Sequence, residues 1–164
     1  MFLKEISSHK QQVKLWVDLD GVLVNFDKGV KKLAGKLPSE LAKKDMWKAV
    51  YSIPEFFENL DWEDDGKQLW NAIKRFHPTI LTGLPTSRNG EQQKRTWCAR
   101  ELGTDVPVIV CPSKDKHLYA KAGYILIDDR NDNVEAWVRS GGTGILHRST
   151  VATLNELESY INVV

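Results

Sequence analysis

The chain has 164 residues, of which 41% are hydrophobic and 27% are charged, a length and balance typical of one globular domain. Its 23 basic and 22 acidic residues leave a net charge of +1, without the basic excess expected of a protein that binds nucleic acid. No apolar run approaches the roughly 20 residues of a membrane span, and the first residues lack the apolar core of a secretory signal. We therefore expect a cytoplasmic protein without a membrane partner. Its two cysteines are expected to be free thiols.

The first part of the chain begins with a strand and continues with helices. Residues 13–19 are rich in branched and aromatic side chains, which predicts a strand that ends at Asp20-Gly21. Apolar residues at helical spacing follow, and Ser39 is suited to capping one of these helices because its hydroxyl can accept a hydrogen bond from the first turn. The predicted helices cover 26–37, 40–51 and 66–76, with a single turn at 55–60.

Strands and helices alternate regularly from residue 79 onward. Such alternation requires crossover connections and produces a mainly parallel sheet, so the predicted fold class is α/β, a three-layer, Rossmann-like parallel sheet with helices on both faces. Gly103 is expected to end one of the helices, because glycine readily adopts the backbone conformation that closes a helix. The predicted strands are 79–82, 106–111, 124–127 and 143–146, and the predicted helices are 91–102, 116–121, 131–139 and 151–162.

Polar residues follow the predicted strands at the edge where ligands of a parallel α/β sheet bind, beyond the carboxyl ends. Crowded carboxylates repel one another and take up protons unless a cation lies between them. Mg²⁺ suits such a site, because it binds oxygen ligands and accepts a substrate phosphate. The residues at this edge are Asp18, Asp20, Thr82, Asp128 and Asp129, together with Lys114 and Lys116 between the third and fourth strands.

This set of residues can transfer a phosphoryl group. An aspartate is ionised at neutral pH and needs no base to act as a nucleophile, so Asp18 can accept phosphate as an acyl phosphate. Asp20 lies two residues further along an extended chain and points to the same side, where it can protonate the leaving oxygen and later activate water. Thr82 and a lysine can bind the phosphate oxygens, and Gly21 allows the backbone to approach the ligand closely.

The same residues resemble the four motifs of the haloacid dehalogenase superfamily of phosphotransferases. The first motif is similar to residues 17–23 (Val-Asp-Leu-Asp-Gly-Val-Leu), the second to 80–83 (Ile-Leu-Thr-Gly), the third to Lys116 and the fourth to 125–130 (Ile-Leu-Ile-Asp-Asp-Arg).

Within that superfamily the chain resembles the short 5'(3')-deoxyribonucleotidases. Phe26 after the first motif and the Phe56-Phe57 pair carry this resemblance. The third-motif lysine of that group follows an aspartate, which favours Lys116 over Lys114.

The resemblance implies a single haloacid dehalogenase-like domain over 1–164, with a small helical cap inserted at about 28–65 and Mg²⁺ as the cofactor. Asp18 is then the nucleophile and a metal ligand, and Asp20 is the acid/base, with its backbone carbonyl on the metal. Asp129 is the direct metal ligand of the acidic pair, and Asp128 supports it. The implied phosphate-binding residues are Thr82, Gly83 (where that group often has a serine) and Lys116, and the expected substrate pocket is lined by Phe26, Trp47 and Phe57.

The predicted function is hydrolysis of (deoxy)nucleoside monophosphates. One alternative is a 3'-phosphatase acting on nucleic-acid ends, which the balanced charge disfavours. Another is a phosphatase for a different small organic phosphate. A signalling receiver domain uses similar residues, but its acceptor aspartate comes on a later strand than its acidic pair, and here the order is reversed. The sequence leaves the oligomeric state open, a homodimer included.

The remaining conspicuous residues are interpreted as structural. Trp47 and Trp62 are the exceptions, because an aromatic face in the insert can stack on a nucleobase. The acidic run 63–65 is interpreted as the first turn of the next helix, where the helix dipole favours acids. The residues assigned to the core are Trp16, Trp70 and Trp137; those assigned to structural or solvated positions are His77, His117 and His147; and those assigned to a solvated helix surface are Arg88, Lys94, Arg95 and Arg100.

Overall fold

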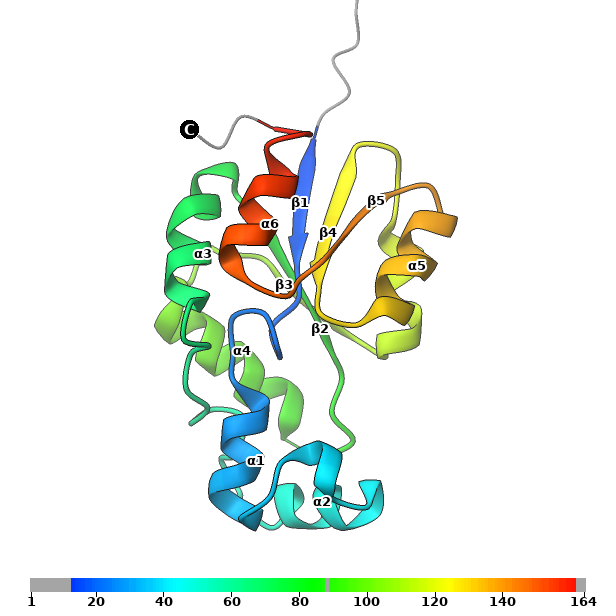
Figure 1. The fold of residues 1–164 in the computed structure, drawn as a ribbon. Helices are drawn as coiled ribbons and strands as arrows, with labels where there is room; N and C mark the ends of the chain where they lie inside the picture. The colour runs from blue at the N-terminus through cyan, green and yellow to red at the C-terminus, as the bar shows by residue number, and fades with distance from the viewer. Residues whose placement is uncertain (1–12, 88, 162–164) are drawn as a thin grey trace, which may run out of the picture.

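The structure, a computed structural model, describes residues 13–87 and 89–161. A five-stranded sheet forms its centre (Figure 1). All neighbouring strands run parallel, in the order β3-β2-β1-β4-β5, which confirms the predicted α/β fold class. The strands are β1 (Lys14–Val17), β2 (Thr79–Gly83), β3 (Val108–Cys111), β4 (Tyr124–Asp128) and β5 (Thr143–Leu146).

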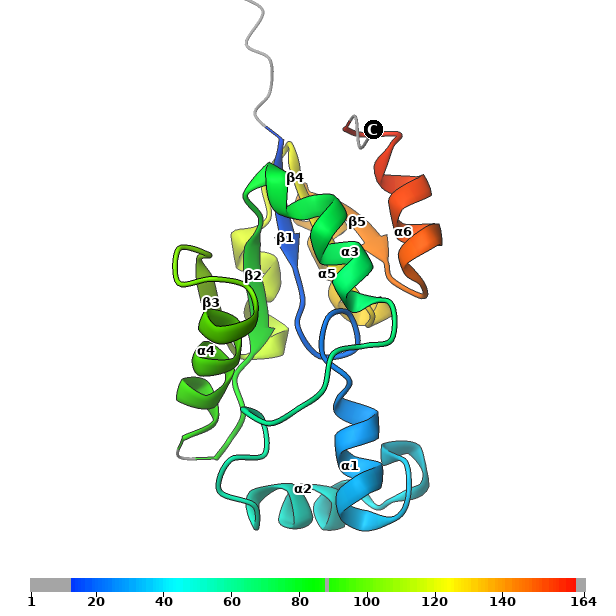
Figure 2. The ribbon, with the colours of Figure 1, turned by 90° about the vertical axis from the view of Figure 1, so that its left-hand side faces the viewer.

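Helices occupy both sides of the sheet, as Figures 1 and 2 show. Of the parts of the chain that the structure describes, no helix has the length and apolar character needed to cross a bilayer. The α-helices are α1 (Phe26–Ala34), α2 (Lys43–Tyr51), α3 (Gly66–Ile73), α4 (Gly90–Glu101), α5 (Asn131–Arg139) and α6 (Thr150–Leu157), and the 3-10 helices are η1 (Pro38–Glu40), η2 (Lys74–Phe76) and η3 (Ser113–Tyr119).

The apolar side chains of the strands divide between two clusters, because successive residues of a strand point to opposite faces. On β1, Leu15 and Val17 pack into the cluster under α3, α4 and α6, whereas Trp16 packs into the cluster under α5. The rings of Trp16 and Trp137 lie 5.8 Å apart. Both faces of the sheet are therefore covered, as an all-parallel sheet requires, and the assignment of Trp16, Trp70 and Trp137 to the core is confirmed.

Several element boundaries differ from the prediction. The strand expected over 13–19 ends at Val17, and the third strand begins at Val108, two residues later than expected. The helix expected to reach residue 37 ends at Ala34, because Gly35 takes a φ of 73° and donates its N–H back to the carbonyl of Lys31. The closing helix ends at Leu157. The expected end of that helix, at residue 162, and the first residues, on which the expectation about a secretory signal rests, lie outside the described residues.

Ser39 does not cap α2. It lies within η1, and α2 begins four residues later, after Ala42. Glu40 takes the capping role for η1, because its carboxylate accepts a hydrogen bond of 2.7 Å from the backbone N–H of Leu37.

The first part of the segment between β1 and β2 lies beyond the carboxyl end of the sheet, where α1 and α2 pack together (Figure 1). We call residues 28–65 the cap segment; its separation from the core as a cap is a prediction. Side chains of α4 form hydrogen bonds with backbone groups in the later part of the cap segment, residues 54–60. Gln93 accepts a hydrogen bond from the N–H of Phe57 (2.9 Å) and donates to the carbonyl of Pro54 (2.8 Å), and Trp97 donates to the carbonyl of Leu60 (2.9 Å). The cap segment is therefore attached to the core beside the carboxyl end of β2.

Candidate active site

The strand order creates a switch point between β1 and β4. The chain proceeds from β1 through β2 to β3 on one side, then crosses to β4 and β5 on the other. Ligands of such sheets bind at this point, because the two connections leave a crevice beyond the strand ends. Asp18 follows β1, and its backbone N–H donates to the carbonyl of Ile127 on β4 (2.9 Å). Asp128 is the last residue of β4, and Asp129 follows it.

Three carboxylates from these two strand ends form a cluster. Asp18, Asp128 and Asp129 each contribute one oxygen atom, and these atoms all lie within 4.8 Å of one another. Asp18 and Asp128 are buried, with 5% and 0% of their surface exposed, and Asp129 is half-buried. Three of the four acids that the sequence analysis expected at this edge therefore lie together, and Asp20 is outside the cluster. A hard divalent cation suits this all-oxygen donor set.

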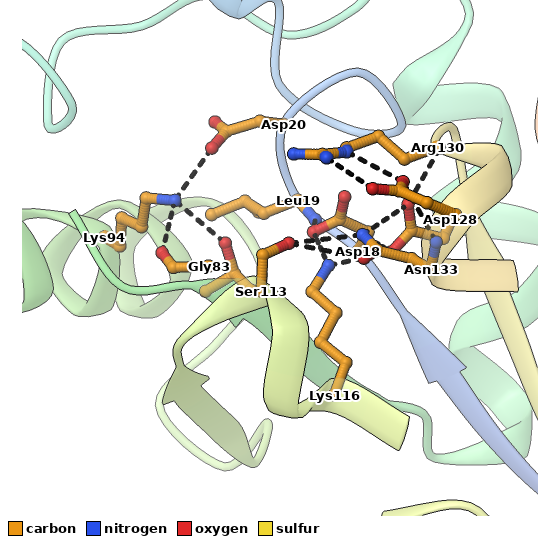
Figure 3. Close-up of polar contacts among 12 residues, drawn as sticks. Asp18, Leu19, Asp20, Gly83, Lys94, Ser113, Lys116, Asp128, Arg130 and Asn133 are labelled. Atoms are coloured by element: carbon orange, nitrogen blue, oxygen red, sulfur yellow. Dashed lines mark hydrogen bonds and ion pairs between the residues drawn. The ribbon is translucent and has the colours of Figure 1, made fainter. Parts of the chain in front are cut away.

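Lys116 lies between two of these acids, as Figure 3 shows. Its Nζ is 2.8 Å from Asp18 Oδ1 and 2.8 Å from Asp128 Oδ2, and the side chain is only 2% exposed. Lys114, the other candidate, is exposed. One lysine thus serves a group of three carboxylates, so negative charge remains in excess.

Asp128 is held by two further donors that the sequence analysis missed. The side-chain amide of Asn133 donates to both of its carboxylate oxygens (3.1 and 3.3 Å), and the backbone N–H of Arg130 donates to Oδ1 (2.9 Å). Asn133 lies in the first turn of α5, directly after the acidic pair, and an amide at that spacing is the signal that could have revealed it. Lys116 is a third donor to Asp128, whose carboxylate is fully buried. These contacts fit a residue that supports the site rather than one that touches a ligand.

The electrostatics of the cluster reflect burial and mutual repulsion. Burial raises the pKa of Asp18 to about 8, against the opposing effect of Lys116. Burial and the neighbouring Asp128 raise the pKa of Asp129 to about 6. Burial by itself lowers the pKa of Lys116, but the two adjacent carboxylates outweigh it and raise that pKa above its usual value. A bound cation would favour the ionised carboxylates, because it offsets both effects.

Gly21 makes room for this cluster. Its φ of 79° is a conformation that glycine adopts freely, and a Cβ at this position would lie 2.2 Å from Asp129 Oδ2. The backbone of the loop after β1 and the Asp129 carboxylate are therefore packed directly together, and only glycine permits this contact. The close approach supports a ligand site built from the loop and the end of β4.

A cavity of about 520 Å³ opens above the cluster. Most of the predicted site residues line it, but Thr82 and Asp128, both fully buried, do not. The predicted residues that line it are Asp18, Asp20, Phe26, Trp47, Phe57, Gly83, Lys116 and Asp129.

Similarity to known proteins is visible in structure and not in sequence. No family model matches the chain, and no curated protein sequence matches it. Its structure is similar to that of a haloacid dehalogenase-like family hydrolase from Xanthomonas campestris, with a TM-score of 0.61 at 12% identity over 93% of each chain. This chain has the haloacid dehalogenase-like fold. A hydrolase from Streptococcus pneumoniae (TM-score 0.53, 11% identity, 90% of this chain and 99% of that one) and L-2-haloacid dehalogenase from Xanthobacter autotrophicus (TM-score 0.53, 14% identity, 92% and 84%) are similar to it as well.

The interpretation of Lys94 as a solvated residue proves wrong in this haloacid dehalogenase-like fold. Lys94 was assigned to a solvated helix surface, but it is only 4% exposed and lines the cavity. The helical period explains the error, because Lys94 shares a face of α4 with the buried Trp97, whereas Arg95 and Arg100 lie on outer faces. Arg88 lies outside the described residues.

Lys94 joins the loop after β1 to the end of β2. Its Nζ donates to Asp20 Oδ2 (2.7 Å), to the carbonyl of Gly83 (2.9 Å) and to Thr82 Oγ1 (3.0 Å), as Figure 3 illustrates for Asp20 and Gly83. Thr82 shares a face of β2 with Ile80, which directs its side chain toward α4, and Thr82 does not line the cavity. The hydroxyl of Thr82 therefore contacts the lysine in this structure, and its predicted contact with phosphate stays a prediction.

Two acids of the run 63–65 also line the cavity, in contrast to their interpretation as the first turn of a helix. Asp65 precedes α3 without capping it, and its carboxylate instead accepts a hydrogen bond of 2.7 Å from the N–H of Thr150, at the start of α6. Glu63 faces the cavity, where burial and the neighbouring Asp27 raise its pKa to about 7.

Of the histidines that the structure describes, His147 reaches the cavity wall. It is 4% exposed, burial lowers its pKa, and its Nδ1 lies 2.8 Å from Thr153 Oγ1, so its interpretation as a structural residue fits the structure. The two cysteines, Cys98 and Cys111, are buried and unpaired, as predicted.

Aromatic side chains line the cavity on the side of the cap segment. The ring of Phe26 lies 5.8 Å from that of Trp47 and 6.4 Å from that of Phe57, with which it stacks at 17°. Trp62, the other residue considered for base stacking, packs against Trp97 (5.0 Å) and does not line the cavity. The aromatic side of the site is therefore built from Phe26, Trp47 and Phe57.

Proposed function

We propose that this chain is an Mg²⁺-dependent phosphomonoesterase that hydrolyses (deoxy)nucleoside monophosphates through an aspartyl-phosphate intermediate. The observation that carries the proposal is the buried group of Asp18, Asp128 and Asp129 with Lys116, at the switch point of the sheet. The proposed residues for holding Mg²⁺ are Asp18 and Asp129, with the backbone carbonyl of Asp20. When bound, Mg²⁺ supplies positive charge that stabilises the phosphate oxygens.

Asp18 is the proposed nucleophile. Its Oδ1 accepts hydrogen bonds from the N–H of Leu19 and from Lys116, both at 2.8 Å. Among the contacts of the described residues, this leaves Oδ2 as the oxygen available to attack. A bond forms between this oxygen and phosphorus, and the bond from phosphorus to the ester oxygen breaks.

Asp20 is the proposed acid and base. It lines the same cavity and gives a proton to the departing alcohol oxygen. As a carboxylate it then accepts a proton from a water molecule, whose oxygen attacks phosphorus and releases inorganic phosphate from Asp18. The side chain of Asp18 is thereby regenerated, and no other reactant is consumed.

The size and lining of the cavity support a nucleotide as the substrate. A volume of about 520 Å³ lies within the range of roughly 300–1,000 Å³ found for small-ligand sites. Phe26, Trp47 and Phe57 provide aromatic faces, on which any nucleobase can stack. Phe26 and Phe57 are also among the residues on which the sequence resemblance to the 5'(3')-deoxyribonucleotidases rests.

A phosphate-release screen tests this function. The purified protein is assayed with dUMP, dTMP, sugar phosphates, p-nitrophenyl phosphate and a DNA strand bearing a 3'-phosphate, with Mg²⁺ and with EDTA. We expect Mg²⁺-dependent release from the deoxynucleotides and a loss on the order of 10⁴-fold or more in Asp18→Asn. Trp47→Ala should raise the KM for dUMP by about 5–150-fold, since stacking on a base contributes roughly 1–3 kcal/mol, and leave the KM for a sugar phosphate, which has no aromatic ring, nearly unchanged.

Each alternative gives a different result in this screen. Release from sugar phosphates without release from any nucleotide would remove the nucleotide part of the proposal. A salt-sensitive preference for the 3'-phosphate strand would support the nucleic-acid phosphatase. A stable phosphoprotein without turnover would support the receiver domain, and chloride release from a 2-haloacid without phosphatase activity would indicate the dehalogenase chemistry of the Xanthobacter autotrophicus enzyme.

A further inference from the structure

Lys94 is a buried cation to which the proposed reaction assigns no role. A lysine ammonium has three N–H donors, and here all three have partners within the site. The acceptors are Asp20 Oδ2 at 2.7 Å, the carbonyl of Gly83 at 2.9 Å and Thr82 Oγ1 at 3.0 Å. With only 4% of its surface exposed, the side chain is held in one place by packing and by these three bonds.

The bond to Asp20 determines how that carboxylate is oriented. The Asp20 side chain is 29% exposed, and the residue lies after the end of β1, in an isolated bridge with Val24. Oδ2 is engaged by Lys94, while Oδ1 is buried and has no hydrogen-bond partner among the described residues. A buried oxygen without a partner is unfavourable, so Oδ1 contributes nothing that holds the side chain in this orientation. The bond from Lys94 to Oδ2 therefore fixes the orientation of the carboxylate.

The other two bonds tie Lys94 to the end of β2. Gly83 is the last residue of β2 and Thr82 precedes it, so the ammonium is attached to a rigid strand end rather than to a loop. The Asp20 carboxylate is thus linked, through Lys94, to the core of the sheet. Because the reacting groups of an enzyme lose efficiency when they are displaced by about 1 Å, such a link has a direct effect on catalysis.

We infer that Lys94 is a positioning residue, which orients the Asp20 carboxylate toward the leaving oxygen of the substrate; this inference rests on the proposed phosphatase function. The competing role for a lysine that lines the cavity is direct contact with the phosphate. The two roles differ in what they predict for the leaving group. A residue that acts through Asp20 matters only where the leaving oxygen needs a proton, whereas a residue that binds phosphate matters for every ester.

The first experiment compares two leaving groups in Lys94→Met. The alkoxide of dUMP needs a proton to depart, whereas 2,4-dinitrophenolate departs without one. We expect kcat/KM for dUMP to fall by about 10–100-fold, and that for 2,4-dinitrophenyl phosphate to change little. The ratio of the two values is insensitive to misfolding, because an inactive fraction lowers both rates equally. Arg95→Met is the matched control, since Arg95 lies on the same helix and bonds instead to Glu91 and to the carbonyl of Val108, and it should leave the ratio unchanged.

The second experiment places Lys94→Met in an Asp20→Ala background. If Lys94 acts through Asp20, its substitution has little further effect on dUMP hydrolysis once Asp20 is absent, so the two losses do not add. Equal losses on both esters in the single variant, or full additivity in the double variant, would overturn the positioning role while leaving the phosphatase function intact. A wild-type protein that releases phosphate from neither ester would overturn both.

Discussion

Gly21→Ala tests whether the loop after β1 and the Asp129 carboxylate form one ligand site. The new Cβ would lie 2.2 Å from Asp129 Oδ2, and ordinary contact begins at 3.4 Å, so the carboxylate must retreat by about 1 Å. In addition, a φ of 79° costs a residue other than glycine about 1–2 kcal/mol. Gly21→Ala is therefore expected to lower the free energy of unfolding and also to displace the Asp129 carboxylate.

The chain offers a control that separates these two effects. Gly35 has a similar φ of 73°, but a Cβ there meets no atom within 4 Å. Gly35→Ala should lose the same 1–2 kcal/mol of unfolding free energy, equivalent to about 2–4 °C in Tm per kcal/mol, and keep full activity.

The assay measures phosphate release against Mg²⁺ concentration, together with thermal unfolding, for both variants. Mg²⁺ demands nearly ideal octahedral geometry, and changes around metal ligands typically weaken metal binding by about 10–100-fold. We expect Gly21→Ala to need about 10–100-fold more Mg²⁺ for half-maximal rate. If Gly21→Ala kept the wild-type Mg²⁺ dependence and turnover, and lost only as much stability as Gly35→Ala, the proposed metal role of Asp129 would be refuted.

Two further predictions concern the charges of the cluster. Lys116→Met should destabilise the metal-free protein by about 3–5 kcal/mol in urea unfolding, because it leaves buried carboxylates unpaired. Lys114 is exposed, so Lys114→Met should change the unfolding free energy by less than about 0.5 kcal/mol. Equal effects of the two substitutions would contradict this account. The folded-state pKa values of Asp18 and Asp129, about 8 and about 6, lie above the ordinary value of 3.8. The two carboxyl groups therefore contribute fully to the stability of the metal-free protein below about pH 4, where they are protonated. This contribution is lost as the pH rises through about 6 and about 8. Thermal unfolding should therefore show a decline over that range that is smaller in Asp18→Asn, and a stabilisation by Mg²⁺ that grows with pH; a Mg²⁺ effect independent of pH would contradict the assignment.

The sequence by itself determined the sheet and most of the acidic edge. Branched residues such as those of 124–127 predict a buried strand from local composition alone, and α5 and β5 have the predicted boundaries. Once the strands are known to be parallel, their carboxyl ends must share one edge of the sheet. The meeting of Asp18 with Asp128 and Asp129 follows from that geometry, and so it needs no knowledge of side-chain packing.

Tertiary structure alone decided which other residues reach that edge. Lys94 and Asp20 are 74 positions apart, and Asp65 and Thr150 are 85 apart, so no local pattern connects either pair. In the sequence Lys94 is one of several basic residues of a polar helix, and only the docking of α4 directs its face toward the cavity. Short-range periodicity is encoded in neighbouring residues, whereas the partner of a buried charge depends on how whole elements pack, and for Lys94 only the folded chain supplies that partner.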